Sequence, residues 1–412
     1  MDARVSPVAV ASLLVGLGAD EACVAAASLL VARPPPAKAD LAAAGPEAAR
    51  VAEAARRALG VRWIAGGRTP ARHAVEAVRA IAGESRALVV ALAVVLVRLR
   101  AAERAGEPDA AFAREALAVW APAAALLGVR PIQRELEDLA FKIADRPAYE
   151  AVARFVARSR EAREGALLAA REALRGALAD GAVEARITGR AKHLWSIHQK
   201  LRARRDREPN LHDLFGLRVL VESEAACYEA LGVVHAAFTA VPARFKDYVA
   251  RPKANGYQSL HTVVVVPLAA EEQVEIQIRS RAMHAHAEHG TAAHLRYKGV
   301  EAPATSLLEA RWIYPLTPSG EVRRLPRGAT ALDFAYAIHT DVGRGYSGAR
   351  IGGKLVKIDA PLATGDIVEI LHSARAHATE GQLGRVRTAR ARNRIRAVLH
   401  RGRPGGALVR SA

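Results

Sequence analysis

The sequence is poor in cysteine, methionine and aromatic residues. Its 412 residues include two cysteines, Cys23 and Cys227, two methionines and 5% aromatic residues. Two cysteines without metal-ligand spacing exclude a disulfide framework and are typical of a reducing compartment. The longest uncharged apolar runs, such as residues 87–97, are too short to span a bilayer, and no signal-peptide cleavage site is evident. We therefore expect a cytoplasmic protein with no membrane partner.

Acidic residues are scarce relative to basic ones. The chain has 60 Lys and Arg against 42 Asp and Glu, a formal net charge of +18 and a pI of about 10.6. Such an excess favours anionic partners, nucleotides or RNA among them, but does not identify a reaction. The length is sufficient for two or three domains with cores of their own.

The hydrophobic pattern changes along the chain. Residues 1–180 alternate Ala, Leu and Val with Arg and Glu at helical spacing, which predicts an all-α region. A mixed α/β region follows, with strands expected at 214–221, 262–266 and 274–278 and helices at 226–238 and 283–298. Residues 312–371 predict a hairpin, a helix, a second hairpin and a strand, which is typical of a small β-grasp module.

We therefore expect a multidomain α+β protein. Its expected parts are a helical domain at 1–150, a helical connector at 151–185, a mixed α/β nucleotidyltransferase-like domain at 186–300, a β-grasp domain at 311–373 and a basic tail at 374–412. The tail contains ten arginines and one acidic residue.

Two basic clusters in the α/β region suit a polyphosphate. Lys192, Ser196 and Lys200 recur every four residues, which predicts one face of a helix. A second cluster follows in a predicted loop that contains Arg244, Lys246, Arg251 and Lys253. Two cationic elements can hold a polyphosphate between them, although a basic helix face is also typical of simple solvation. The sequence contains no P-loop, and no G-x-G-x-x-G motif opens a helix after a strand, so side chains must hold the phosphates.

A tyrosine and two carboxylates stand beside these clusters. Tyr257 follows an Asn255-Gly256 turn that can present its ring to a base, and core or interface packing is the alternative. Asp213 and Glu275 adjoin otherwise apolar strands, where they can hold Mg²⁺ against phosphate oxygens; solubility of an edge strand is the alternative. The histidines after residue 283 lack zinc-site spacing, so we expect them to pack on a helix.

The order and spacing of six blocks resemble the synthetase domain of the RelA/SpoT homologues, the alarmone (p)ppGpp synthetases. These blocks lie at 189–200, 213–219, 244–248, 252–262, 275–279 and 283–294. Residues 332–340 with 365–370 resemble the TGS module of that family, and residues 135–141 resemble the end of its N-terminal HD hydrolase region.

The resemblance implies transfer of pyrophosphate from ATP to the 3′-hydroxyl of GDP or GTP, with release of AMP. It implies Mg²⁺ as the cofactor, with Asp213 as a ligand and Glu275 as either a second ligand or the base. It also implies the remaining site residues: Arg190, Lys192, Ser196 and Lys200 for ATP, Arg244 and Lys246 for catalysis, and Lys253, Asn255, Tyr257, His261, Gln277 and Arg279 for GDP or GTP.

The sequence also departs from the family pattern. Before His193 the only histidine is His73, and no His-Asp pair occurs there, so we expect a pseudo-hydrolase domain. The linker before the TGS region is short, and we expect the later regulatory modules to be absent. In longer relatives TGS reads tRNA on the ribosome; His339 either does so here or simply packs. A catalytically silent tRNA- or ribosome-binding regulator with the synthetase fold is the alternative function.

Overall fold

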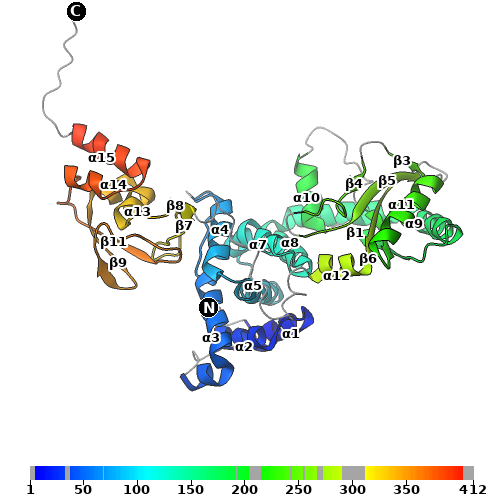
Figure 1. The fold of residues 1–412 in the computed structure, drawn as a ribbon, viewed down its shortest axis with the longest axis horizontal. Helices are drawn as coiled ribbons and strands as arrows, with labels where there is room; N and C mark the ends of the chain where they lie inside the picture. Colours follow the sequence, from blue (N-terminus) through cyan, green and yellow to red (C-terminus); the bar gives the residue numbers. More distant parts are fainter. Residues whose placement is uncertain are drawn as a thin grey trace, which may run out of the picture. The chain divides into compact units, whose positions relative to one another are not determined.

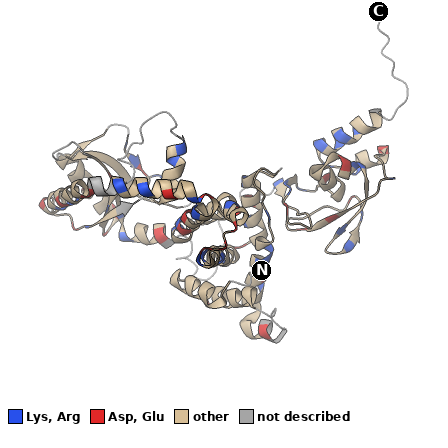
Figure 2. Ribbon diagram, turned by 180° about the vertical axis from the view of Figure 1, so that it is seen from behind, with Lys and Arg blue, Asp and Glu red and all other residues tan. Residues whose placement is uncertain are grey.

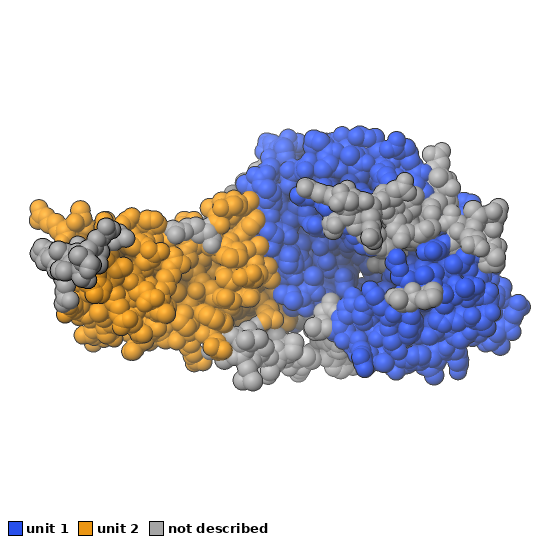
Figure 3. All heavy atoms as spheres, turned by 90° about the horizontal axis from the view of Figure 1, so that it is seen from above, with its two compact units in different colours: residues 1–33, 92–300 blue, residues 34–91, 301–412 orange. Residues whose placement is uncertain are grey.

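The structure is a computed structural model, and it describes residues 5–32, 38–67, 69–191, 193–203, 215–241, 244–253, 256–266, 272–289 and 311–401. The chain forms two compact units, each made from two separate stretches (Figure 3). One unit contains residues 1–33 and 92–300, and the other contains residues 34–91 and 301–412. No helix within the described ranges is long and apolar enough to cross a membrane.

Helices account for the first part of the larger unit, as the sequence predicts. Their bounds are α1 (Pro7–Gly16), α2 (Glu21–Val31), α5 (Ser85–Ala105, which begins in the other unit), α6 (Ala110–Glu115), the π-helical turn η1 (Ala116–Trp120), α7 (Ala121–Leu126), α8 (Arg130–Ala144) and α9 (Arg146–Asp180). Aspartates begin several of them: Asp20 accepts a hydrogen bond from the Cys23 amide at 2.8 Å, and Asp145 accepts one from the Ala148 amide at 3.1 Å. Such caps satisfy amides that the first helical turn leaves unpaired.

A mixed sheet follows the helices. Within the described residues it has six strands in the order β1-β2-β6-β5-β3, with β4 paired to β5 (Figure 1). The bounds are β1 (Arg186–Ala191), β2 (Phe215–Val221), β3 (Thr239–Ala240), β4 (Lys246–Asp247), β5 (Leu260–Val266) and β6 (Glu272–Ser280), with helices α10 (Leu194–Ala203), α11 (Glu224–Ala237) and α12 (Arg281–His289). β2 and β6 are parallel, whereas β6 and β5 are antiparallel.

The two faces of this sheet differ in chemistry. One face is apolar and packs with residues of α9 and α11, including Leu174, Leu178, Ala230 and Val234. Because side chains alternate along a strand, the intervening residues lie on the opposite face. In β6 this alternation separates buried Val274, Ile276 and Ile278 from Glu275, Gln277 and Arg279. The α9–α11 side therefore holds the core and leaves the other face for polar groups.

Most elements expected in this region are confirmed, and one is wrong. β2, β5, β6 and α11 lie where the sequence predicts strands and a helix. The helix expected to carry Lys192 with Ser196 and Lys200 instead begins at Leu194, because the preceding residues pair with β2 as strand β1. Lys192 itself, and the part of the last helix beyond His289, lie outside the described residues.

The second unit contains the expected β-grasp elements together with part of the helical region. Its bounds are α3 (Lys38–Leu59), α4 (Ala71–Ala82), β7 (Trp312–Ile313), β8 (Leu325–Pro326), α13 (Ala331–Ile338), α14 (Thr340–Arg344), β9 (Tyr346–Ile351), β10 (Lys354–Val356), β11 (Val368–His372), the 3-10 helix η5 (Glu380–Gly384) and α15 (Ala389–Arg401). β10, β9 and β11 form one antiparallel sheet, and β7 pairs with β8. The hairpin turns at Gly320, whose φ of 85° suits glycine.

Asp333 joins α13 to the chain that leads into α15. Its side chain is 1% exposed and accepts hydrogen bonds from both the amide and the hydroxyl of Thr330 at 3.0 Å. It also accepts from the amides of Arg387 and Thr388 at 2.9 and 2.8 Å. Ala391 and Ile395 of α15 are then buried in the same core. The first part of the region expected to be a basic tail is therefore a packed helix.

Residues before α5 are tied to the β-grasp elements by polar contacts. The Tyr314 hydroxyl donates to Glu76 of α4 at 2.9 Å, and the Thr69 hydroxyl donates to the Val322 carbonyl at 2.9 Å. Arg323 donates to the Thr69 hydroxyl at 2.8 Å. These contacts join segments more than 200 residues apart, which explains why this unit combines two stretches of the chain.

Candidate active site

A row of polar residues crosses the polar face of the mixed sheet. Residues directly opposite one another in paired strands lie on the same face. Five strands contribute one residue each to this row: Thr188 of β1, Arg218 of β2, Gln277 of β6, His261 of β5 and Lys246 of β4. Glu275 lies two residues before Gln277 in β6, and therefore on the same face. The sheet thus brings together residues separated by up to 89 positions in the sequence, counting from Thr188 to Gln277.

Glu275 lies in the interior of the sheet rather than at its edge. Its strand pairs with β2 on one side and with β5 on the other, and its side chain is 15% exposed. The alternative that Glu275 merely keeps an edge strand soluble is therefore wrong. Gly216 lies opposite Glu275 in β2, and a Cβ there would approach the Glu275 carbonyl oxygen to 2.8 Å. Glycine at this position allows the two strands to pair beside the carboxylate.

A chain of polar contacts runs from Tyr257 to Gln277 through Glu275. The Tyr257 hydroxyl lies 2.9 Å from Nε2 of His261, and Nδ1 of His261 lies 3.3 Å from Oε1 of Glu275. Gln277 donates from Nε2 to the same Glu275 oxygen at 3.1 Å. A proton on Nδ1 of His261 satisfies this geometry, because Nε2 then accepts from the tyrosine and Nδ1 faces the carboxylate. The contacts fix the orientation of an acidic group in a cationic surrounding.

The Tyr257 ring is presented by a turn and lies among cations and other rings. The Gly256 amide donates to the Lys253 carbonyl at 2.8 Å, and Gly256 has a φ of 72°, which suits glycine. The Lys253 ammonium lies 5.3 Å from the Tyr257 ring centroid, and the Arg130 guanidinium of α8 lies 5.6 Å from it. The Tyr248 ring centroid is 6.2 Å away. Tyr257 is partly exposed, which does not fit packing in a core, whereas its contacts with α8 and β5 fit the alternative of interface packing.

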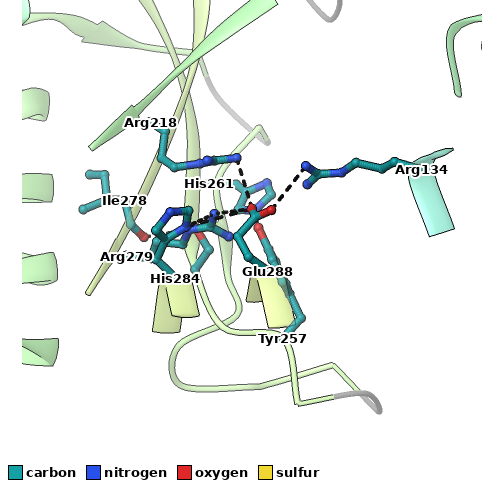
Figure 4. A network of polar contacts seen from close by, with 9 residues as sticks. Arg134, Arg218, Tyr257, His261, Ile278, Arg279, His284 and Glu288 are labelled. Atoms are coloured by element: carbon teal, nitrogen blue, oxygen red, sulfur yellow. Dashed lines mark hydrogen bonds and ion pairs between the residues drawn. The ribbon is translucent and has the colours of Figure 1, made fainter. Parts of the chain in front are cut away.

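Glu288 of α12 is the centre of a second network (Figure 4). Its carboxylate lies 3.2 Å from Arg279, 3.4 Å from Arg134 of α8 and 3.8 Å from Arg218. Arg279 donates from Nη2 to Nδ1 of His284 at 2.6 Å. Arg279 is 2% exposed, and its Nε has no hydrogen-bond partner among the described residues. Glu288 therefore compensates charges that come from the sheet and from the preceding helical region.

Burial and charge have opposite effects within this network. Burial raises the pKa of Glu288, but Arg134, Arg218, Arg279 and His284 outweigh it, so the net pKa lies below the ordinary value of 4.5. Burial also lowers the pKa of the Arg279 guanidinium, against the effect of Tyr257 and Glu288. An arginine nevertheless stays protonated in proteins, so Arg279 provides a fixed positive charge beside the polar row.

Three family models match successive parts of the chain. The model described as "Region found in RelA / SpoT proteins" matches residues 189–302, the TGS domain matches residues 313–372, and the HD domain matches residues 3–130. The GTP pyrophosphokinase of Streptomyces coelicolor is 38% identical over an alignment of 367 positions, which covers 77% of this chain and 43% of the relative. The probable guanosine-3′,5′-bis(diphosphate) 3′-pyrophosphohydrolase of Synechocystis sp. is 37% identical over an alignment of 439 positions, gaps included, which covers 96% of this chain and 57% of the relative.

The chain belongs to the RelA/SpoT family. It spans about half the length of the curated relatives it matches. Among solved structures, the small alarmone synthetase 1 of Bacillus subtilis bound to pppGpp is 30% identical, with 36% of this chain and 82% of that chain covered and a TM-score of 0.27. The family models confirm that the chain contains synthetase, TGS and HD regions, and the HD match ends at residue 130, before the block at 135–141.

Several residues expected in the RelA/SpoT site share the polar face. Glu275, Gln277 and His261 are in mutual contact, and Lys246 lies opposite His261 with an exposed side chain. The backbone of Arg190 lies opposite Gly216, in the same row as Glu275. Arg279 is on this face, but its head group is occupied by Glu288 and His284.

The other residues expected in the RelA/SpoT site lie elsewhere or outside the described part of the chain. Ser196 and Lys200 are four residues apart on α10, and Arg244 is exposed before β4. Lys192, Asp213 and Asn255 lie outside the described residues. His339 is 51% exposed and accepts from the Asp341 amide at 3.2 Å, so it caps α14. His339 therefore has a structural contact at the start of α14, and its half-exposed ring also leaves it accessible.

Sequence reasoning missed the contribution of α8. Arg130 and Arg134 of this helix contact Tyr257 and Glu288, yet neither was expected near the RelA/SpoT site. The pair formed by Arg134 and Glu288 is separated by 154 residues. Their spacing of four places Arg130 and Arg134 on one helical face, but no local signal indicates what that face meets.

Proposed function

We propose that the chain is an alarmone synthetase that transfers pyrophosphate from ATP to the 3′-hydroxyl of GDP or GTP and releases AMP. The observation that carries this proposal is the Glu275 carboxylate, which Gln277 and His261 hold on the cationic face beside Tyr257. Relatives named GTP pyrophosphokinase support it further. Pyrophosphoryl transfer depends mainly on positioning and on neutralisation of charge, and this face offers both.

The acceptor nucleotide would bind at Tyr257. Its partly exposed ring can stack on guanine, and Lys253 beside it would attract the phosphates, with Asn255 lining the same pocket. His261 and Gln277 would then orient Glu275 toward the 3′-hydroxyl. Glu275 would accept the hydroxyl proton or hold the metal ion; both roles require the same ionised carboxylate.

ATP would bind to the basic groups that precede Tyr257 in the synthetase region. Arg190 would contact adenine, and Lys192, Ser196 and Lys200 would contact the phosphates. Arg244 and Lys246 would neutralise charge that develops on the transferred group.

The donors available suit Mg²⁺. This ion is usually held by one or two carboxylates together with substrate phosphates, and Glu275 supplies one partly buried carboxylate on the substrate face. Asp213 would supply the second. When bound, Mg²⁺ would polarise phosphoryl oxygens and neutralise their charge.

We further propose that the HD region has no hydrolase activity. The only histidine before His193 is His73, and no group of three His, Cys, Asp or Glu side chains converges as a metal site within the described ranges. Hydrolysis of the alarmone at an HD site requires such a set of ligands. The relative from Synechocystis carries hydrolase in its name, so the point requires a direct test.

RNA is the proposed macromolecular partner. His339 is exposed on the TGS region, and Arg390, Arg394 and Arg396 are exposed on α15, which appears as a basic helix in Figure 2. Such residues can contact the phosphates of tRNA or of the ribosome, and affinity of this kind falls steeply with salt.

The test is incubation of the purified chain with ATP, Mg²⁺ and GDP or GTP, with chromatographic separation of the nucleotides. AMP and ppGpp or pppGpp should appear together, and both should disappear in the Asp213→Ala variant. Deacylated tRNA and ribosomes, added in parallel, report on the proposed partner. Incubation of ppGpp with Mn²⁺ should release no pyrophosphate. Absence of transfer under all conditions would favour the silent RNA-binding protein instead.

A further inference from the structure

Helix α8 has one face fixed to α5. Arg100 of α5 donates from Nε and Nη2 to Glu135 at 2.5 and 2.6 Å. One helical repeat later, Lys142 donates to Glu103 of α5 at 2.7 Å. Two ion pairs seven residues apart hold the helix along its length, because residues i and i+7 lie on one face.

A second face of α8 contacts the synthetase region along the whole helix. In its second half, Glu137 is hydrogen-bonded to His193, and Asp138 accepts from the Trp195 amide at 2.9 Å at the beginning of α10. Phe141 lies 5.1 Å from the Trp195 ring centroid and 4.5 Å from that of His198. This half therefore fixes α10, the helix that carries Ser196 and Lys200.

The first half of α8 reaches the acceptor side. The Arg130 guanidinium lies 5.6 Å from the Tyr257 ring centroid, within the range of a cation–π contact. One turn later, Arg134 Nη1 lies 3.4 Å from Oε2 of Glu288, whose other oxygen lies 3.2 Å from Arg279. The side chain of Glu288 is 21% exposed, so its ion pairs are only partly screened by water.

We infer that α8 of the HD region forms one wall of the acceptor-nucleotide pocket, with Arg130 at the guanine platform and Arg134 as a positioning residue that acts through Glu288. This inference rests on the proposed function, because it adds residues to the same site. Arg130 supplies positive charge beside Tyr257, where the anionic nucleotide binds. Arg134 holds Glu288, which in turn holds Arg218 of the polar row and Arg279 beside that row.

The physical reason for the Arg134 effect is charge balance. Glu288 is shared by three arginines, so loss of one leaves its carboxylate freer to move toward the remaining two. Arg218 lies opposite Gln277, the residue that donates to Glu275. A change at Arg134 therefore reaches the acceptor side without any contact between Arg134 and the nucleotide.

The experiment measures the acceptor and the donor separately in the full chain. Steady-state transfer is followed with GDP and with ATP varied in turn, and binding of unmodified GDP is followed by isothermal titration calorimetry. For Arg130→Ala we expect the KM for GDP to rise about tenfold, with the KM for ATP changed less than about twofold. For Arg134→Ala we expect the KM for GDP to rise about fivefold. Arg134→Lys should bring the KM for GDP most of the way back to the wild-type value.

Two further variants distinguish a positioning role of Arg134 from a general disturbance of the fold. Arg146→Ala removes an exposed arginine paired with Glu150 on the next helix, and it should leave both KM values unchanged. Each of the substitutions Arg134→Ala and Glu288→Gln removes the same ion pair. The effect of the double variant on the KM for GDP should therefore be smaller than the sum of the two single effects, expressed as free energies.

The outcomes distinguish the inference from the proposed function. Suppose that the wild type is active and that the Arg130 and Arg134 variants raise the KM for ATP as much as the KM for GDP, or change neither KM. That result would overturn the inference without contradicting the proposed synthetase function. A wild-type chain that makes no alarmone and binds no GDP would refute both. A rise in the KM for GDP without a comparable rise in the KM for ATP, together with rescue by Arg134→Lys, supports the inference that α8 forms part of the acceptor site.

Discussion

Oε1 of Glu275 lies 3.3 Å from Nδ1 of His261, in the middle of a sheet rather than at its edge. The arrangement is possible because β5 and β6 are antiparallel and place Gln277 directly opposite His261. Glu275, two residues earlier on the same strand face, then comes within reach of both side chains. The carboxylate is thereby held by neighbours from two strands, which restricts its orientation before a substrate arrives.

Replacement of Glu275 by glutamine tests this carboxylate. Glu275→Gln keeps the shape of the side chain but removes the charge, so we expect transfer to fall by about 10²-fold to 10⁴-fold with little change in folding. The assay is AMP and ppGpp formation, with circular dichroism as the folding check. Glu222→Gln is the matched control, because Glu222 is 79% exposed and pairs with Arg281. Retained activity in Glu275→Gln would refute the assignment.

Two substitutions at Tyr257 separate its ring from its hydroxyl. Tyr257→Ala removes the stacking platform, so the KM for GDP should rise about tenfold or more while that for ATP stays nearly constant. Tyr257→Phe keeps the ring and loses only the contact of the hydroxyl with His261, so it should have the smaller effect. Equal losses in the two variants would show that the hydroxyl, rather than the ring, dominates.

The Glu288 network predicts a pH-dependent stability. The pKa of Glu288 is lower in the folded state than its ordinary value of 4.5, so its ion pairs stabilise the fold above that value. This contribution is lost as the pH falls through the folded-state pKa, because the carboxylate becomes protonated. Glu288→Gln should therefore be less stable than the wild type at pH 7, by about 1–3 kcal/mol.

The same comparison in acid provides the control. Below the folded-state pKa of Glu288 the wild type also has a neutral side chain, so the difference between the two proteins should shrink toward zero. Urea unfolding of both proteins at pH 7 and at acidic pH measures it. A difference that stays constant over the whole range would contradict an ionic origin.

Cys227 should react only after unfolding. Its thiol is buried, and burial together with Glu224 raises its pKa to about 11. The thiolate is the reactive form, so little of it exists at pH 8. We expect neither Cys227 nor the buried Cys23 to react with a thiol reagent in the native protein, and both to react in guanidinium. Rapid labelling of one thiol under native conditions would show that its surroundings open easily.

Asp333 should be essential to the stability of the TGS region. Asp333→Ala leaves the amides of Thr330, Arg387 and Thr388 without their acceptor, at a cost of about 2–4 kcal/mol. Thermal unfolding of the full chain measures the effect on the transition of this region. Asp341→Ala is the control, because that side chain is 61% exposed and should change stability little. Equal effects of the two substitutions would contradict the role of Asp333.

Much of the fold is predictable from local pattern. The apolar alternation in β6 and the run in β5 set both strands, and the Gly320 turn sets the TGS hairpin. β1 was missed because Gly189 and Arg190 have weak strand preference, and pairing with β2 overrides it. The division into two units was not foreseeable either, because it depends on contacts such as Tyr314 with Glu76 across 238 positions.

The candidate site also contains residues that the sequence identified and residues that it could not identify. Glu275, Gln277, His261 and Tyr257 were identified through the family resemblance, and the sheet register explains why they meet. Arg134 could not be identified, because an arginine on a charged helix is ordinarily solvated. Its partner is defined only by tertiary packing.

The second unit has a consequence for the order of synthesis. Residues 34–91 leave the ribosome long before residues 301–412, with which they form one compact unit. Thr69 and Glu76 therefore lack their partners Val322 and Tyr314 until more than 300 residues have been translated. A nascent chain arrested near residue 300 would carry an unmatched early segment, and a shortened recombinant protein ending there would inherit the same exposed surface.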